Sequence, residues 1–107
     1  MSDITLKTPA EIERMRSAGR IVGEVLDGLN ELIQPGVPLG ELDQFAEETI
    51  RGYGAVPSFK GYPSAKNPDS PFPGSICASV NDVIVHGIPN GYVLREGDIL
   101  GVDCGAI

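Results

Sequence analysis

Two side chains in the last third of the sequence are of types that carry chemistry. His86, the only histidine, ends the β-branched run VIVH and precedes Gly87-Ile88-Pro89. A histidine at the end of a strand can exchange a proton near neutral pH or hydrogen-bond to a substrate carbonyl. The alternative is a structural histidine with its own hydrogen bonds, and a single residue does not decide between the two.

Asp103 interrupts the apolar run ILGVDC. Strand alternation directs its neighbours Val102 and Cys104 to the opposite face. A carboxylate in such a strand needs a metal ion, an arginine or several amide donors, because an uncompensated buried charge is driven to protonate. Asp103 is therefore either a metal ligand or a carboxylate that caps a turn or faces solvent at a sheet edge, and one carboxylate alone is no metal site.

Aromatic and thiol side chains form a second candidate group. Apolar ligand pockets are made of such residues, although ordinary core packing uses them too. The group consists of Phe59, Tyr62, Phe72 and Cys77. The phosphate-binding patterns GxxxxGK[ST] and GxGxxG and the hydrolase pattern GxSxG are absent, so neither nucleotide binding nor a serine nucleophile is indicated.

The elements that must position these residues are two helices followed by strands. Thr8, Pro9 and Glu11 form a capping-box start, and Gln34-Pro35-Gly36 ends the apolar periodicity, which predicts a helix over 9–33. A second helix is expected from Pro38 to Gly52 or Gly54. The strands are expected at 55–60, 75–80, 83–86 and 98–104, with a hairpin turn at Asn81-Asp82 and an exposed proline-rich loop at 63–74.

The composition limits the class of protein. The chain has 107 residues, 15 acidic and 8 basic, for a formal charge of −7, which predicts one small domain without a basic surface for direct nucleic-acid binding. No apolar run approaches a membrane span, and the polar start MSDITLK lacks a signal core, so we expect a cytoplasmic protein. The two cysteines, Cys77 and Cys104, are expected to be free thiols.

Four blocks of the sequence together resemble the type I methionine aminopeptidases. They are KTPAEIERMRSAGRIVGEVL, QPGVPLGELD, SICASVNDVIVHGIP and LREGDILGVDCGAI. The resemblance implies an α/β (α+β) pita-bread fold, of which residues 1–107 would form the N-terminal half as a single incomplete catalytic domain. It also implies a cytoplasmic enzyme that removes the initiator methionine from nascent chains with a small second residue, with the ribosome as a possible partner.

The resemblance also implies roles for individual residues. His86 is similar to the family's substrate-contacting histidine, and Asp103 to the first of its five metal ligands. Tyr62, Phe72 and Cys77 fall where the family builds its methionine side-chain pocket, with Phe59 nearby. In such enzymes two divalent ions activate a water and polarise the scissile carbonyl. The ions are cobalt, manganese, iron, zinc or nickel, and oxygen ligands do not choose between them.

Three departures from the family pattern affect these expectations. A proline-rich loop separates Gly61-Tyr62-Pro63 from Phe72-Pro73, and the histidine of that motif is missing. Pro38-Leu39 replaces the hydroxyl residues that usually cap the second helix, at a cost of about 1 kcal/mol. The sequence also stops four residues after Asp103, before any further family ligand, so we expect these 107 residues alone to be inactive.

Two other functions compete with this one. A non-catalytic binding module could keep the pita-bread arrangement and hold a peptide or another chain. A proline-directed peptidase or creatinase relative would share the fold, but the short lead before Thr8 disfavours it.

Overall fold

The computed structural model describes residues 3–64 and 68–107. Helix α1 spans Pro9–Leu32. The predicted capping box is present: Thr8 Oγ1 accepts from the Glu11 N–H at 3.2 Å, and the Thr8 N–H donates to Glu11 Oε1 at 2.8 Å. Ile33 caps the C-terminal end of α1, and Gly36, three residues later, adopts a φ of 96° in the turn that follows. The predicted first helix is therefore confirmed to within one residue.

Helix α2 spans Leu39–Gly52 and begins without a side-chain cap. Instead, the Leu39 and Gly40 N–H groups donate to the carbonyl oxygens of Tyr92 and Asn90, each at 2.9 Å. A distant segment of chain therefore satisfies the first amides of the helix, which the absence of a hydroxyl at Pro38 had left open.

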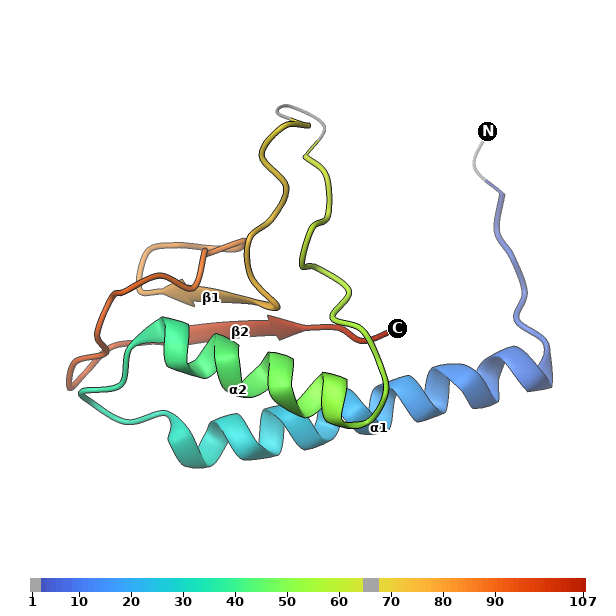
Figure 1. Ribbon diagram of the computed structural model, residues 1–107, viewed down its shortest axis with the longest axis horizontal. Helices are drawn as coiled ribbons and strands as arrows, with labels where there is room; N and C mark the ends of the chain where they lie inside the picture. The colour runs from blue at the N-terminus through green and yellow to red at the C-terminus, as the bar shows by residue number, and fades with distance from the viewer. Residues whose placement is uncertain (1–2, 65–67) are drawn as a thin grey trace.

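Strands β1 (Ile76–Val80) and β2 (Leu100–Cys104) form an antiparallel pair. Ile76, Ala78 and Val80 lie opposite Cys104, Val102 and Leu100, and all six contribute to the hydrophobic core. The alternate pairs, Cys77 with Asp103 and Ser79 with Gly101, lie on the other face of the sheet. Figure 1 shows α1 and α2 side by side along this small sheet.

The core lies between the helices and the sheet. Its buried members are Val25, Leu29, Leu39, Leu42, Ala46, Ile50, Ile76, Ala78 and Leu94. The first turns of α1 extend beyond the sheet (Figure 1), and Met15 there is 58% exposed. The predicted apolar stripe of the first helix is therefore buried only in its C-terminal half, at Val25 and Leu29.

Two of the predicted strands are wrong. Residues 83–86 form no strand, and Asn81-Asp82 is a turn that joins no hairpin. Asn81, at a φ of 55°, donates its N–H to the Ile99 carbonyl at 2.8 Å and accepts from the Ile99 N–H at 3.0 Å. These bonds continue the β1–β2 pairing one residue beyond Val80 and Leu100, and Ile84, within the predicted strand, is 89% exposed.

The predicted strand at 55–60 is reduced to one isolated bridge between Pro57 and Ala106. Pro57 has no N–H to donate, and the chain bends at Ser58 and Phe59. The other two strands are confirmed with shorter bounds. Of the predicted loop 63–74, residues 65–67 lie outside the described residues. The chain on either side of them projects from the body of the protein (Figure 1).

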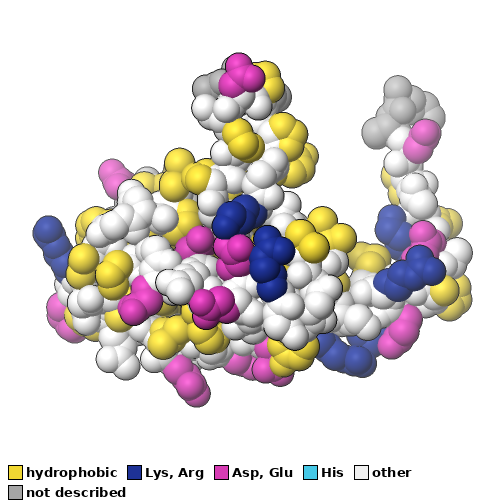
Figure 2. Space-filling view, viewed as in Figure 1, with side chains coloured by type: hydrophobic (Ala, Val, Ile, Leu, Met, Phe, Trp, Pro, Cys, Tyr) yellow, Lys and Arg dark blue, Asp and Glu magenta, His cyan; other side chains and the backbone are white. Residues whose placement is uncertain are grey.

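Acidic and basic side chains are interspersed over the helical face that Figure 2 shows. This face carries no continuous basic patch of the kind that tracks a nucleic-acid backbone. Among residues 3–64 and 68–107, no helix has both the length and the apolar character needed to cross a bilayer.

Candidate functional site

A cavity of about 710 Å³ opens on the face of the sheet that points away from the helices. All six residues singled out from the sequence line it: Phe59, Tyr62, Phe72, Cys77, His86 and Asp103. Further lining residues include Pro63, Pro73 and Ile88. The cavity is lined by residues from the loop between α2 and β1 (within 59–64 and 70–73), from β1, from the segment 86–88 and from β2. Its volume lies within the range of small-molecule sites.

The wall formed by the strands contains Cys77 and Asp103, which are direct cross-strand partners. Strand alternation holds as predicted, since Val102 and Cys104 pack against the core while Asp103 is exposed towards the cavity. Burial raises the pKa of the Cys77 thiol, and the charge of Asp103 adds to this effect. Cys77 therefore lines the cavity as a neutral, soft and apolar group.

Cys104 lies beside Asp103 on the core side of β2. Burial and the Asp103 charge together raise the pKa of its thiol to about 11. Both cysteines are free, as the sequence predicted. Neither environment produces the thiolate that a cysteine nucleophile or a thiolate metal ligand requires.

His86 does not end a strand; it lies in a loop with a φ of 60°. A positive φ is uncommon outside glycine and persists where the surroundings impose it. Here the next residue, Gly87, is attached to β1 at both polar atoms. Its carbonyl accepts from the Ala78 N–H at 2.8 Å, and its own N–H donates to Ser79 Oγ at 3.0 Å.

Gly87 also lies so close to β1 that no other residue fits. A Cβ atom at this position would overlap the carbonyl group of Ala78 and the Cα of Ser79. The strand thereby fixes the backbone next to His86 and holds the imidazole at the cavity wall.

The residues described here do not form a metal site by themselves. Asp103 is an oxygen donor of the kind that divalent ions accept. However, no group of three or more His, Cys, Asp or Glu side chains able to hold a metal ion occurs within 3–64 and 68–107. Asp103 fits as one ligand of a larger set and not as a complete site.

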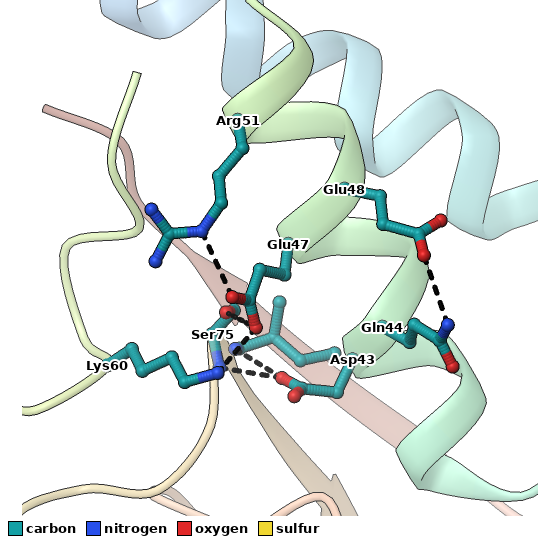
Figure 3. A network of polar contacts seen from close by, with 8 residues as sticks. Asp43, Gln44, Glu47, Glu48, Arg51, Lys60 and Ser75 are labelled. Atoms are coloured by element: carbon teal, nitrogen blue, oxygen red, sulfur yellow. Dashed lines mark hydrogen bonds and ion pairs between the residues drawn. The ribbon is translucent and has the colours of Figure 1, made fainter. Parts of the chain in front are cut away.

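Sequence reasoning missed two carboxylates of α2, Asp43 and Glu47, which bond to residues near those that line the cavity (Figure 3). Both are half-buried. Asp43 Oδ1 accepts from the backbone N–H groups of Ser75 at 2.7 Å and Ile76 at 3.0 Å, where β1 begins. Their spacing of four, each one residue after a buried position (Leu42 and Ala46), is the signal that could have indicated a partner.

Relatives with closely similar sequences are bacterial. The chain is 51% identical over 105 residues to a methionine aminopeptidase of Clostridium acetobutylicum, covering 97% of this chain and 39% of the relative. It is 50% identical over 103 residues to methionine aminopeptidase 1 of Bacillus subtilis, covering 96% and 39%. The chain therefore spans about two-fifths of the length of these relatives.

Solved structures agree with the sequence relatives. Methionine aminopeptidases of Rickettsia prowazekii and Thermotoga maritima superpose on the chain with a TM-score of 0.87 each, at 34% and 36% identity. Each alignment covers 98% of this chain and 40% of the other. The expected pita-bread arrangement of two helices followed by antiparallel strands is confirmed, as is the resemblance to methionine aminopeptidases. The sequence profile of metallopeptidase family M24 matches residues 13–107, and the chain belongs to that family.

Proposed function

We propose that residues 1–107 are an incomplete catalytic domain of a metal-dependent methionine aminopeptidase and supply its substrate pocket. The enzyme would remove the initiator methionine from nascent proteins whose second residue is small. The observation that carries the proposal is the single cavity lined by Phe59, Tyr62, Phe72, Cys77, His86 and Asp103. We place the enzyme in the cytoplasm, where nascent chains emerge, with the ribosome as a candidate partner.

The aromatic and thiol part of the cavity suits a methionine side chain. A thioether is unbranched and polarisable, and it packs favourably against aromatic rings and other soft groups. Phe59, Tyr62 and Phe72 supply rings, and the neutral thiol of Cys77 adds a soft surface. We assign these four residues to the recognition of the substrate side chain.

His86 and Asp103 supply the polar part of the cavity. We assign His86 to the substrate backbone, where its imidazole would hydrogen-bond to the peptide at the bond to be cleaved. We assign Asp103 to a divalent metal centre as one carboxylate ligand. The remaining ligands would come from sequence outside these 107 residues, so the chain alone is expected to be inactive; cobalt, manganese, iron, zinc and nickel all remain candidates.

A chimera tests the proposal. The present chain replaces the matching residues of the Clostridium acetobutylicum relative, and the rest of that relative completes the protein. We expect the chimera, supplied with manganese or cobalt, to release methionine from Met-Ala-Ser and to leave X-Pro peptides intact. The variants His86→Ala and Asp103→Asn should each lose at least about 10²-fold in kcat/KM, because each removes a group that contacts the substrate or the metal.

Three results would contradict the proposal. The first is a folded, metal-loaded chimera that releases no methionine. The second is full activity in the His86→Ala and Asp103→Asn variants. The third is methionine binding by the chain together with an inactive chimera, which would favour the non-catalytic binding module.

A further inference from the structure

One side chain of α2 contacts both ends of the cavity-lining segment between α2 and β1. The outgoing arm of this segment, residues 59–64, leaves the body of the protein, and its returning arm, residues 68–75, comes back to the start of β1; both arms form part of the cavity wall. Glu47, on α2, contacts both ends of this segment. Its Oε1 atom accepts from Lys60 Nζ at 2.6 Å and from Ser75 Oγ at 3.3 Å (Figure 3).

The carboxylate of Glu47 is itself held in place. Its second oxygen, Oε2, accepts from Arg51 Nε at 3.0 Å, one helical turn further along α2. Hydrogen bonds from Lys60 and Arg51 lower the pKa of Glu47, so the carboxylate is charged at neutral pH. A charged carboxylate with both oxygens engaged has a defined orientation, which favours a fixed position for Lys60 and Ser75.

The two ends that Glu47 joins lie within two residues of pocket residues in the sequence. Lys60 lies between Phe59 and Gly61-Tyr62, and Ser75 lies two residues before Cys77. The two arms are also bonded to each other: the Gly61 N–H donates to the Phe72 carbonyl at 2.8 Å, and the Phe72 N–H donates to the Tyr62 carbonyl at 2.9 Å. A displacement of Lys60 therefore moves both aromatic arms.

Asp43 and Glu47 hold different parts of the segment between α2 and β1. Asp43 holds only the returning end, through the backbone N–H groups of Ser75 and Ile76. Glu47 adds the ion pair to the outgoing end at Lys60. The side chains of Lys60 and Glu47 are 42% and 25% exposed, and ion pairs exposed to this degree contribute little to global stability. The role of the pair is to fix the position of Lys60 relative to α2.

From these contacts we propose that Glu47 is a positioning residue for the methionine pocket. Acting from α2, it sets where the two hydrogen-bonded arms that carry Phe59, Tyr62 and Phe72 lie relative to β1. The inference rests on the proposed function for the identity of the ligand, but the effect on the arms is independent of it.

The test uses the 107-residue chain and its Glu47→Gln variant, which keeps the size of the side chain and removes its charge. Glu48→Gln is the matched control, because Glu48 is the next residue of α2, and its carboxylate accepts from Gln44 Nε2 of the same helix at 3.0 Å (Figure 3). Lys60→Met removes the outgoing contact alone. NMR spectra report the ring signals of Phe59, Tyr62 and Phe72, thermal unfolding reports Tm, and a titration with L-methionine reports affinity.

We expect Glu47→Gln and Lys60→Met to shift the three ring signals and to weaken methionine binding about tenfold, since small displacements in a site have large effects. Their Tm should stay close to that of Glu48→Gln, whose ring signals and affinity should match the parent chain. Ring signals and affinity in Glu47→Gln that equal those of Glu48→Gln would overturn the proposal. If the parent chain binds no methionine while the rings still shift only in Glu47→Gln and Lys60→Met, the positioning role stands and the proposed function fails.

Discussion

The two faces of the β1–β2 sheet are made of alternate residues of the same strands, but they are held together in different ways. The helical face places Ile76, Ala78 and Val102 in a core shared with α1 and α2. The cavity face carries Cys77, Ser79 and Asp103, and it is completed by irregular segments that a few hydrogen bonds attach to the strands.

This difference separates stability from function. Burial of apolar side chains stabilises the helical face, and that contribution is spread over many residues. On the cavity face, single polar contacts decide where a functional side chain lies, as Gly87 does for His86. Substitutions on the first face should change the free energy of unfolding, and those on the second should change geometry with smaller effects on stability.

The largest effect is expected at the centre of the helical face. Leu42 is fully buried between α1, α2 and the sheet, so Leu42→Ala should lower the free energy of unfolding by about 2–5 kcal/mol. Chemical denaturation followed by circular dichroism measures the loss. The control Leu26→Ala removes the same atoms at a position that is 43% exposed and should lose far less. Equal losses at both positions would mean that the helical face is not the core.

A smaller effect with a clear geometric readout is expected for Gly87→Ala. The new methyl group would overlap the Ala78 backbone, so we expect a loss of about 1–3 kcal/mol and a shift of the His86 imidazole signals. His86 is the only histidine, so its NMR signals are assigned without ambiguity. Gly91→Ala is the control, because a Cβ at Gly91 meets nothing within 4 Å. Unchanged His86 signals in Gly87→Ala would break the link between β1 and this side chain.

The cap of α1 provides a perturbation remote from the cavity. Thr8→Ala removes the side-chain acceptor of the capping box and should lower stability by about 1 kcal/mol. The cavity signals of Phe72 and His86 should not move. Thr5→Ala, just outside the helix, is the control in the same denaturation measurement. A shift of the cavity signals in Thr8→Ala would show that the two regions are not separate.

The smallest effect concerns pH. Lys60 and Arg51 lower the pKa of Glu47 in the folded chain, so its ion pairs are complete above the ordinary glutamate pKa of about 4.3 and are lost as the pH falls through the lowered value. The ring signals of Phe59 and Tyr62 in the parent chain should therefore shift at acidic pH, below the ordinary glutamate pKa, as these ion pairs are lost. An NMR titration of the parent chain and Glu47→Gln tests this. An acid shift of the same size in both would assign it to another group.

Local signals predicted the helices well. Thr8, Pro9 and Glu11 determine where α1 begins through contacts within one turn, and Gln34-Pro35-Gly36 determines where it ends, so no distant residue is needed. The strand at 83–86 was wrong for the opposite reason. Its β-branched residues have the right propensity, but pairing depends on a partner; β1 pairs with β2, and the chain after Asn81 bonds to β1 at Gly87, outside the predicted strand.

The candidate site also has one part that the sequence predicts and another that it does not. The residues that line the cavity could be selected by type and motif, and the structure brings all six of them together. The cap of α2 by Tyr92 and Asn90, and the contacts of Glu47 with Lys60 and Ser75, join segments that are distant in the sequence. Neither set of contacts produces a pattern within a single stretch of sequence from which it could be predicted.

The central claim is that the cavity holds a methionine side chain. The most direct measurement is an NMR titration of the 107-residue chain with L-methionine, with L-aspartate as the comparison ligand. We predict saturable shifts of the signals of Phe59, Tyr62, Phe72 and His86 with methionine and none with aspartate. No shift of these signals with methionine, or equal shifts with both amino acids, would contradict the claim.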